Sequence, residues 1–284
     1  MATRTAPVSP FDEARFTATL GKCGIARSLQ LFDSISSTMT AADDILRSEG
    51  SVNAHGTLVL AETQTAGQGR RGRSWQSEAG NLYFSMIWRP KATASAPSDV
   101  LAELVRLNLA TGVAVVRAVE ASGFKGAKIK WPNDVYHGEP KRKLSGMLVN
   151  FNGNDAAVLG VGINVMQDME AHATAVSLRT LCTENSNPKL PVREDVLAFF
   201  CQHLERLMSL PTSEVLQEYQ EHDLLRGTTI RVHHKTREED DARDFDATVL
   251  GVDTTGMLRV CPLQAGAEEV LLSGEEVSIT PQAS

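Results

Sequence analysis

The sequence has no apolar run of the roughly 18 residues that a membrane-spanning helix needs, and its first residues hold no apolar signal core. It also lacks a CxxC pair, and no histidine stands at ligand spacing from its cysteines. Scattered cysteines of this kind indicate free thiols in a reducing compartment: Cys23, Cys182, Cys201 and Cys261. These absences predict a soluble protein that is neither secreted nor membrane-bound. The cytoplasm is the expected compartment, and the mitochondrion stays open.

Basic residues are outnumbered by acidic ones, and the formal net charge is −7. A general nucleic-acid binder needs a basic excess to neutralise phosphates, so we expect no such activity. Apolar residues at 42% and charged residues at 22% are ordinary for a globular protein. The length of 284 residues is enough for one large domain and a small one.

The first part of the chain predicts a mixed α/β body behind a lead-in with one short helix. Apolar residues at helical spacing predict helices over Ser37–Glu49, Asp99–Ser122, Glu194–Leu210 and from there to about His222. Gly50 could end the first helix, since glycine adopts a positive φ at low cost. Strand-like runs lie between the helices: Thr57–Glu62, Asn81–Trp88, Ala127–Trp131, Leu144–Phe151 and Ala156–Val165. An Asn152-Gly153 pair predicts a hairpin turn between the last two.

After Gly227 the pattern changes to five short strands separated by turn residues, which is typical of a small β-barrel. The charged segment Lys235–Asp244 predicts a solvated turn between the first two strands. We therefore expect an α/β (α+β) fold in three parts: a lead-in over 1–27, a body over 28–224 and a C-terminal barrel over 225–284.

The segment Gly67–Arg73 (GQGRRGR), here called the arginine loop, lies between two predicted strands. Its glycines allow a ligand to approach the backbone, and its three guanidiniums can bind phosphate oxygens bidentately. It is not a Walker loop, because GxxxxGK[ST] is absent. Taken alone, the loop is equally compatible with a solvated basic turn or an RNA-contacting arm.

Three further segments carry polar groups at strand ends, where ligand sites form in α/β sheets. They are Lys130–Asp134 (KWPND), Lys143 with the following Leu-Ser-Gly, and Gly160–Asn164 (GVGIN). The last two also have a structural explanation: an edge lysine such as Lys143 blunts aggregation, and strand glycines make room for a neighbour.

Together, in this order and at these spacings, the four segments resemble those of biotin–protein ligases, the family that includes the bacterial biotin repressor. The arginine loop is similar to the family's GRGRRGR, and Lys130–Asp134, Arg142–Gly146 and Gly160–Asn164 match the KWPND, RKLSG and GxGIN segments. The resemblance covers nearly the whole chain from Leu31. It implies a class-II-synthetase-like catalytic domain and a C-terminal SH3-like barrel, in agreement with the pattern above.

The resemblance also implies roles for individual residues. Catalytic roles fall on Arg70, Arg73, Lys143 and Asp134, the last as the group that orients the incoming lysine. Biotin contacts fall on Ser37, Thr38, Gln64, Gln68, Gly69, Arg70, Lys143, Gly146, Gly160 and Gly162. ATP contacts fall on Arg70, Arg73, Trp75, Asn133, Lys143 and Asn164.

The sequence departs from the family at three positions. Met39 stands where the family usually has asparagine, Gln68 replaces an arginine of some members, and Thr280 lies where some members have an arginine. These departures leave three interactions open: a biotin contact at Met39, the binding of the adenylate at Gln68, and a nucleotide contact from the C-terminal barrel at Thr280.

The implied chemistry is attack of a biotin carboxylate on the α-phosphorus of ATP, followed by transfer of biotin from the mixed anhydride to a lysine. Guanidiniums and an ammonium around that point would offset the repulsion between the two anions. We expect Mg²⁺ to take part, although no carboxylate cluster identifies its ligands. The implied partner is the biotin carboxyl carrier domain of a biotin-dependent carboxylase. Monomer and homodimer both stay open.

Three other functions compete with this one. A lipoate or octanoate transferase resembles the same fold and keeps a pocket lysine, but the arginine loop favours biotin. Bifunctional regulators have an N-terminal helix-turn-helix of about 60 residues. Only about 30 precede the first matched segment, so we expect a monofunctional enzyme without DNA binding. An RNA-binding arm would predict steep salt dependence and no role for biotin.

Overall fold

The structure, a computed structural model, describes residues 9–90, 97–138, 141–151, 155–167, 173–186, 189–234, 244–275 and 277–281. Its helices are α1 Glu13–Leu20, α2 Thr38–Ala54, α3 Pro97–Ala121, α4 Leu178–Glu184, α5 Arg193–Ser209 and α6 Thr212–Glu221. The strands of the body are β1 Ser28–Ile35, β2 Thr57–Gln64, β3 Leu82–Trp88, β4 Lys128–Lys130, β5 Asp134–His137, β6 Arg142–Phe151 and β7 Ala157–Ile163. The C-terminal strands are β8 Thr229–His234, β9 Phe245–Val252, β10 Leu258–Pro262, β11 Val270–Leu272 and β12 Val277–Pro281.

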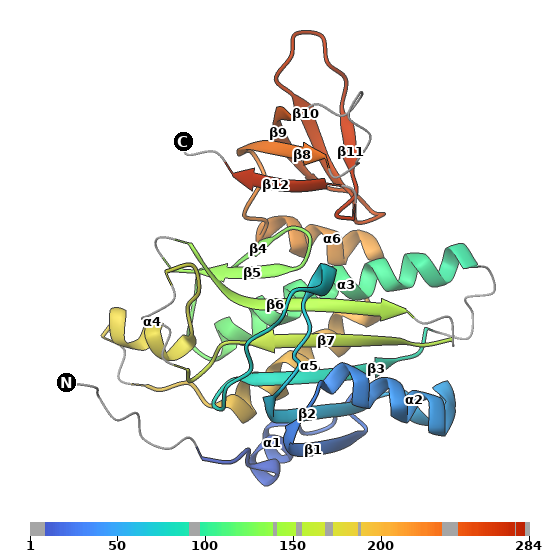
Figure 1. Ribbon diagram of the computed structural model, residues 1–284, viewed down its shortest axis with the longest axis vertical. Helices are drawn as coiled ribbons and strands as arrows, with labels where there is room; N and C mark the ends of the chain where they lie inside the picture. The colour runs from blue at the N-terminus through green and yellow to red at the C-terminus, as the bar shows by residue number, and fades with distance from the viewer. Residues whose placement is uncertain are drawn as a thin grey trace.

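The body is built on a seven-stranded mixed sheet in the order β1-β2-β3-β7-β6-β5-β4 (Figure 1). Strand β1 pairs with β2 in parallel, and the remaining neighbours are antiparallel. Because β3 lies between β2 and β7, segments far apart in the chain meet at the centre of the sheet. Four of the strands that carry the sequence motifs therefore lie side by side.

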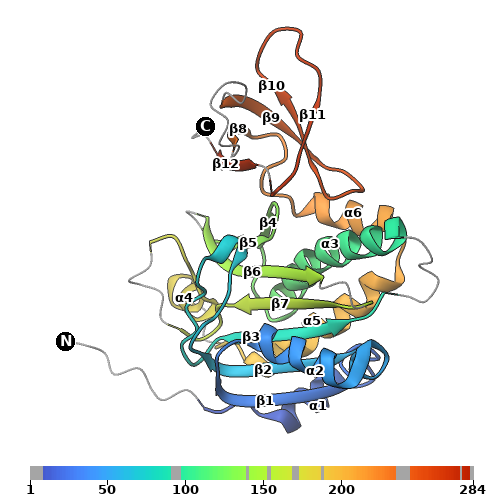
Figure 2. The same ribbon diagram turned by 45° about the vertical axis from the view of Figure 1, so that its right-hand side comes forward.

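The two faces of the sheet are covered differently, as Figure 2 shows. Helices α3 and α5 pack on one face, over the larger apolar core that contains Phe84, Leu107 and Phe200. Helix α2 covers only β2, β3 and β7 on the other face, over a smaller core that contains Val59 and Ile87. The part of that second face over β6 and β7 is left for the arginine loop. Alternation of side chains along each strand separates the two cores.

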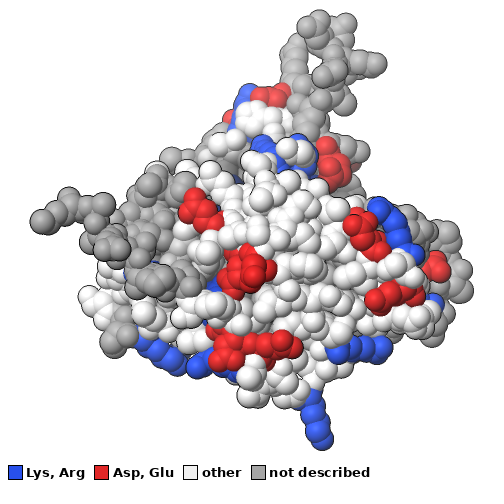
Figure 3. Space-filling view, turned by 60° about the horizontal axis from the view of Figure 1, so that its bottom comes forward, with Lys and Arg blue, Asp and Glu red and all other residues white. Residues whose placement is uncertain are grey.

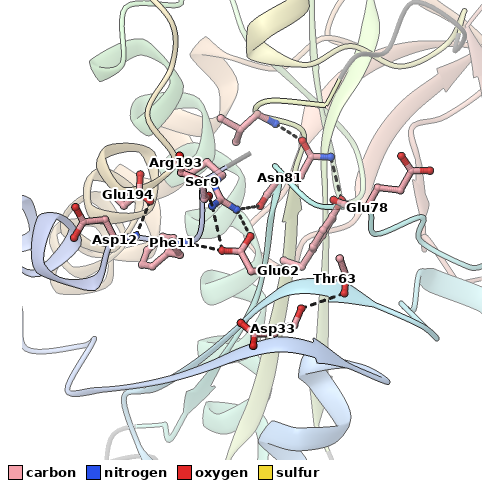
Figure 4. A network of polar contacts seen from close by, with 12 residues as sticks. Ser9, Phe11, Asp12, Asp33, Glu62, Thr63, Glu78, Asn81, Arg193 and Glu194 are labelled. Atoms are coloured by element: carbon pink, nitrogen blue, oxygen red, sulfur yellow. Dashed lines mark hydrogen bonds and ion pairs between the residues drawn. The ribbon is translucent and has the colours of Figure 1, made fainter. Parts of the chain in front are cut away.

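The N-terminal segment is tied to the body by a buried ion pair between Arg193 of α5 and Glu62 of β2 (Figure 4). The two nitrogens of Arg193 lie 2.6 and 3.1 Å from the two oxygens of Glu62. Arg193 also donates to the carbonyl of Ser9, and Glu62 accepts from the backbone N–H of Phe11. The pair is thus fully hydrogen-bonded, and removing one partner would leave the other charge buried, at a cost of about 3–5 kcal/mol.

The C-terminal sheet has the order β11-β10-β9-β8-β12 and is antiparallel throughout. The connection to it extends the main sheet, because Ile129 of β4 exchanges backbone hydrogen bonds with His222 and Leu224. Trp131, just after β4, donates from its indole to the carbonyl of Gly256, in the turn between β9 and β10 of the C-terminal unit. The strand that carries the KWPND segment is therefore fastened to both units.

Among the described residues no helix is long and apolar enough to cross a membrane. On the face drawn in Figure 3, acidic and basic side chains are interspersed, and no basic stripe crosses the described part of that face.

The predicted fold class is confirmed, with a mixed sheet flanked by helices and a second antiparallel sheet at the C-terminus. Three elements were not predicted: β1, β5 and α4. Gly50 is non-helical, with φ 77° and ψ 159°, so the first helical segment of α2 ends there as predicted, and a separate helical turn continues to Ala54. The turn at Asn152-Gly153 and most of Lys235–Asp244 lie outside the described residues.

Candidate active site

A hollow in the open face of the sheet forms where three glycines replace side chains. Gly146 of β6 pairs with Gly162 of β7, and Gly160 of β7 pairs with Ser85 of β3. Paired residues on adjacent strands point to the same face, so the missing side chains leave one continuous depression. The indole of Trp75 lies over Gly146 and Gly162, since a methyl group on Gly162 would come within 2.6 Å of that ring. The side chain of Met39 covers Gly160 in the same way, at 2.7 Å.

Above this hollow lies a pocket of about 500 Å³, here called the inner pocket. At its closed end Thr38 donates through its backbone N–H and its hydroxyl to Oε1 of Gln64, at 2.8 and 3.2 Å. The hydroxyl of Ser37, 2% exposed, has no partner among the described residues. A buried hydroxyl without a partner costs about 1–3 kcal/mol, so it calls for a polar ligand atom. The end of the inner pocket at Ser37, Thr38 and Gln64 is therefore suited to an uncharged polar group.

The arginine loop is an ordered hairpin at the mouth of the inner pocket. The backbone N–H of Gly69 donates to the carbonyl of Arg73 at 2.7 Å, and that of Trp75 donates to the carbonyl of Gly67 at 2.9 Å. At the tip, Arg71 and Gly72 both have positive φ values, of 60° and 70°. Glycine takes this conformation freely and arginine does not, so the tip carries some backbone strain.

The loop is held from outside by the C-terminal sheet. Arg70 forms an ion pair with Glu275, and Arg71 donates to the carbonyls of Gly274 and Val277. Partial burial lowers the pKa of Arg71, and the neighbouring Arg70 lowers it further, because the like charges repel. The turn before β12 thus provides acceptors for a crowded cluster of cations.

The KWPND segment forms the wall opposite the loop. The peptide bond between Trp131 and Pro132 is cis. Asn133 exchanges two hydrogen bonds with Met147 of β6 and accepts one from Arg70 at 3.1 Å. Asp134 pairs with Gly146 across β5 and β6, which brings its carboxylate beside the glycine hollow.

Lys143 lies between Asp134 and Trp75. Its Nζ is 2.8 Å from the Asp134 carboxylate and 5.1 Å from the centre of the Trp75 ring. Burial lowers the pKa of the nearby Lys130, and the Asp134 carboxylate partly offsets that effect. Together with Arg70, Arg71 and Arg73 these groups line a second hollow of about 930 Å³, here called the outer pocket, which opens into the inner one.

The structure brings together nearly all the residues that the sequence singled out. The inner pocket contains each residue expected to bind biotin: Ser37, Thr38, Gln64, Gln68, Gly69, Arg70, Lys143, Gly146, Gly160 and Gly162. The outer pocket contains each residue expected to be catalytic, Arg70, Arg73, Lys143 and Asp134, together with Trp75 and Asn133. These roles themselves stay predictions.

Asn164 and Thr280 lie apart from both pockets. The amide of Asn164 donates to the carbonyls of Lys143 and Val176, so it positions the start of β6. Thr280 contacts His233 on the neighbouring strand. Sequence reasoning missed Tyr83 in the inner pocket and Glu275 at the loop, because neither lies in a recognisable segment.

No group of three or more His, Cys, Asp or Glu side chains within the described ranges could hold a metal ion. The expectation of Mg²⁺ thus gains no ligand set from the protein. Mg²⁺ commonly binds through substrate phosphates and one or two carboxylates, and Asp134 is a carboxylate in the outer pocket.

Residues 31–168 match the model of the biotin/lipoate A/B protein ligase family. The bifunctional ligase/repressor BirA of Bacillus spizizenii is 29% identical over 239 residues, which cover 80% of this chain and 67% of that protein. The biotin–[acetyl-CoA-carboxylase] ligase of Mycobacterium tuberculosis is 29% identical over 249 residues, with 84% of each chain covered. Among solved structures, the biotin protein ligase of Aquifex aeolicus in complex with biotin and ATP superimposes with a TM-score of 0.68 at 25% identity. That match covers 90% of this chain and all (100%) of the other.

Proposed function

The chain belongs to the biotin/lipoate A/B protein ligase family and to its biotin–protein ligase group, and we propose that it activates biotin with ATP as biotinyl-5′-AMP and transfers the biotinyl group to a lysine of a carrier protein. In this proposal residues 28–224 form the catalytic domain, and residues 225–284 form a separate domain that supports the arginine loop.

The observation that carries the proposal is the polarity of the inner pocket. Its closed end offers the unpartnered hydroxyl of Ser37 and the hydrogen-bonding groups of Thr38 and Gln64. The fused ring of biotin has a ureido group, with one carbonyl and two N–H donors, that can satisfy them. The dithiolane ring of lipoate has no such group and would leave buried polar atoms unpaired, which selective sites reject strongly. The inner pocket therefore favours biotin over lipoate.

In the first step, a biotin carboxylate oxygen attacks the α-phosphorus of ATP, and the bond to the bridging oxygen breaks to release pyrophosphate. Lys143 and Arg70 line both pockets, so they stand where carboxylate and phosphate would meet. Their charges offset the repulsion between the two anions and the charge that develops on the phosphoryl oxygens. Arg73 adds a third cation on the phosphate side. Mg²⁺ bound to ATP would neutralise charge on the departing pyrophosphate.

In the second step, the neutral amine of a carrier lysine attacks the acyl carbon, and the bond to the phosphate oxygen breaks to release AMP. Asp134 is the carboxylate that would take up the amine proton. In the structure Asp134 pairs with Lys143. When Lys143 turns to the phosphate, Asp134 loses that partner and can receive the cationic form of the incoming lysine. The arginine loop would meanwhile shield the anhydride from water.

The partner in this proposal is the biotin carboxyl carrier domain of a biotin-dependent carboxylase, as the name of the Mycobacterium tuberculosis relative suggests. The test is the mass of a carrier domain incubated with this chain, biotin and ATP. We expect a gain of one biotinyl group that needs both small molecules and the acceptor lysine. A carrier whose acceptor lysine is changed to arginine serves as the negative control. If the unaltered carrier gains no more mass than this control, the proposal is refuted.

A calorimetric comparison distinguishes the lipoate alternative. Biotin should bind the chain in the presence of a non-hydrolysable ATP analogue, and lipoate should bind at least about a hundredfold more weakly, because it leaves the buried polar groups unpaired. Equal affinities would contradict the assignment of the inner pocket.

A further inference from the structure

A chain of side-chain hydrogen bonds runs beneath the inner pocket from β3 to the arginine loop. Ser85 contacts Thr38 at 2.9 Å, Thr38 contacts Gln64 at 3.2 Å, and Gln64 contacts Ser77 at 2.9 Å. Ser77 then contacts the carbonyl of Trp75 at 3.1 Å. Ser77 and Ser85 are 7% and 0% exposed, so water cannot replace these contacts.

Two backbone groups fix the direction of every bond in this chain. The carbonyl of Trp75 can only accept, so the hydroxyl of Ser77 must donate its proton to it. Ser77 therefore acts as the acceptor toward Gln64, and the Gln64 group that faces it must be the amide nitrogen. The backbone N–H of Thr38 can only donate, so the group of Gln64 that faces it must be the oxygen. The amide of Gln64 is thereby oriented from both sides. The hydroxyl of Thr38 consequently donates to Gln64, and that of Ser85 donates to Thr38.

This direction determines what Thr38 and Gln64 can offer a ligand. The only hydroxyl proton of Thr38 is used on Gln64, so Thr38 meets a ligand as an acceptor. The oxygen of Gln64 already receives two hydrogen bonds, and its nitrogen keeps one N–H. A ligand ring with both N–H and C=O groups fits this pattern, together with the unpartnered hydroxyl of Ser37.

The chain also connects the inner pocket to the arginine loop. It ends on the backbone of Trp75, whose indole covers Gly146 and Gly162 and lies beneath Lys143. Gly67 makes room for this end, because a methyl group there would lie 2.5 Å from the Trp75 carbonyl and 2.7 Å from the Ser77 hydroxyl. The position of the loop base therefore depends on Ser77.

We propose that Ser77 and Ser85 are positioning residues of the inner pocket: they act through Thr38 and Gln64, hold those side chains in one donor and acceptor arrangement, and so set the affinity for the biotin ring. This inference rests on the proposed function, and it adds two residues that no sequence motif identifies. Neither serine lies within the set of side chains that line the inner pocket.

The test is a double-mutant cycle on biotin binding, measured by calorimetry on the full chain. Ser77→Ala and Ser85→Ala each break the chain, and each should weaken biotin binding about tenfold, as expected for a disturbed buried hydrogen bond. The two hydroxyls do not touch, so independent sites would give about a hundredfold loss in the double variant. We expect the double variant to lose little more than either single one, because one break already frees Gln64 and Thr38.

Steady-state kinetics separate positioning from damage to the fold. Both variants should raise the KM for biotin about tenfold and leave kcat and the KM for ATP within about twofold. The control is Ser122→Ala, which removes a half-buried hydroxyl that donates to the carbonyl of Ala118 in α3, away from the site. It should leave biotin binding unchanged.

The outcomes are distinct. If the unaltered chain binds no biotin, the proposed function fails. If it binds biotin and the two serine variants bind biotin equally well, the positioning role is wrong and the proposed function stands. The same holds if the losses of biotin affinity in the two single variants multiply in the double variant. If the losses of biotin affinity in the two single variants do not multiply in the double variant, and kcat is preserved, the positioning role of the two serines is supported.

Discussion

The inner and outer pockets meet at Arg70, Lys143 and Trp75 but are built on opposite principles. Away from Arg70 and Lys143, the inner pocket is lined by neutral groups, and the hydrogen bonds of Thr38 and Gln64 are made within the body. The outer pocket holds charged, partly buried groups that pair with one another or with the C-terminal unit, as Lys143 does with Asp134 and Arg70 with Glu275. The inner pocket can select a ring without rearranging. The outer pocket must exchange its ion pairs for phosphate, which suits a site that passes through two reactions.

The largest expected effect is at the junction of the two pockets. Lys143→Gln removes the ammonium that faces both reacting anions, and we expect adenylate formation to fall roughly a thousandfold, as for loss of a preorganised group that stabilises developing charge. Pyrophosphate exchange into ATP measures this step. Lys128→Gln is the control, since Lys128 lies on the same stretch of sheet but bonds to the carbonyl of Glu221. Unchanged exchange in the Lys143 variant would refute its role.

Substitutions that fill the glycine hollow should show which pocket contributes to the KM for biotin and which to the KM for ATP. A methyl group at Gly160 collides with Met39 at the closed end, and one at Gly162 collides with Trp75 at the junction. Overpacking typically costs about 1–3 kcal/mol, or about five- to a hundredfold in affinity. Gly160→Ala should therefore raise the KM for biotin alone, and Gly162→Ala should raise the KM for biotin and for ATP. If both variants changed the same constants, the two pockets would not be separate.

Loosening the arginine loop should affect the intermediate rather than ring selection. Arg70→Gly removes contacts to Asn133 and Glu275, so the loop should close less tightly over the adenylate. We expect biotin affinity to fall by no more than about 160-fold, since a single charged hydrogen bond is worth about 1.5–3 kcal/mol. Labelling of bystander proteins should rise, as seen on streptavidin blots. Labelling at the level of the unaltered chain would contradict the shielding role.

A smaller effect is expected from the carboxylate that holds the loop. Glu275→Gln removes a negative charge that competes with phosphate for Arg70, so the KM for ATP should fall, by no more than about fivefold because exposed pairs contribute at most about 1 kcal/mol. The difference should shrink as salt is added, since salt screens the competing charge. A KM for ATP that rises would mean that support of the loop outweighs the competition.

The smallest effect is expected away from both pockets. Arg206 lowers the pKa of Glu218 through a paired hydrogen bond, and Arg117 contributes less. A carboxyl with a lowered folded-state pKa stabilises the fold above its unfolded pKa, and this stabilisation disappears as the pH falls through the folded value. Glu218→Gln should therefore cost about 1 kcal/mol of unfolding free energy at neutral pH and nothing in strong acid. Urea unfolding at the two pH values measures this, and kcat should not change.

The sequence predicted the motif-bearing parts of the site because four segments together, in their order and spacing, resemble those of a known family, whereas the arginine loop alone is equally compatible with a solvated turn or an RNA-contacting arm. It could not predict what depends on register. The hollow exists because Gly146 faces Gly162 and Gly160 faces Ser85, and no local pattern reveals cross-strand neighbours. Ser77 gives no signal for the same reason.

The missed elements have similar causes. Strand β1 has equal numbers of polar and apolar residues without strict alternation along its length, and it is defined by its parallel partner β2. Strand β5 has only four residues and begins at a charged one. The contact between Arg70 and Glu275 spans 205 residues, far beyond any window of sequence periodicity.

The backbone hydrogen bonds of Ile129 with His222 and Leu224 have a consequence for protein engineering. In a chimera that receives the C-terminal sheet of a relative, the length of the connection between α6 and β8 alone would permit many splice points. A junction ahead of His222 would bring foreign residues into the edge of the main sheet, directly beside the strand that leads to Lys130. Splicing after Leu225 keeps that edge native, so such hybrids would report on the transplanted sheet alone.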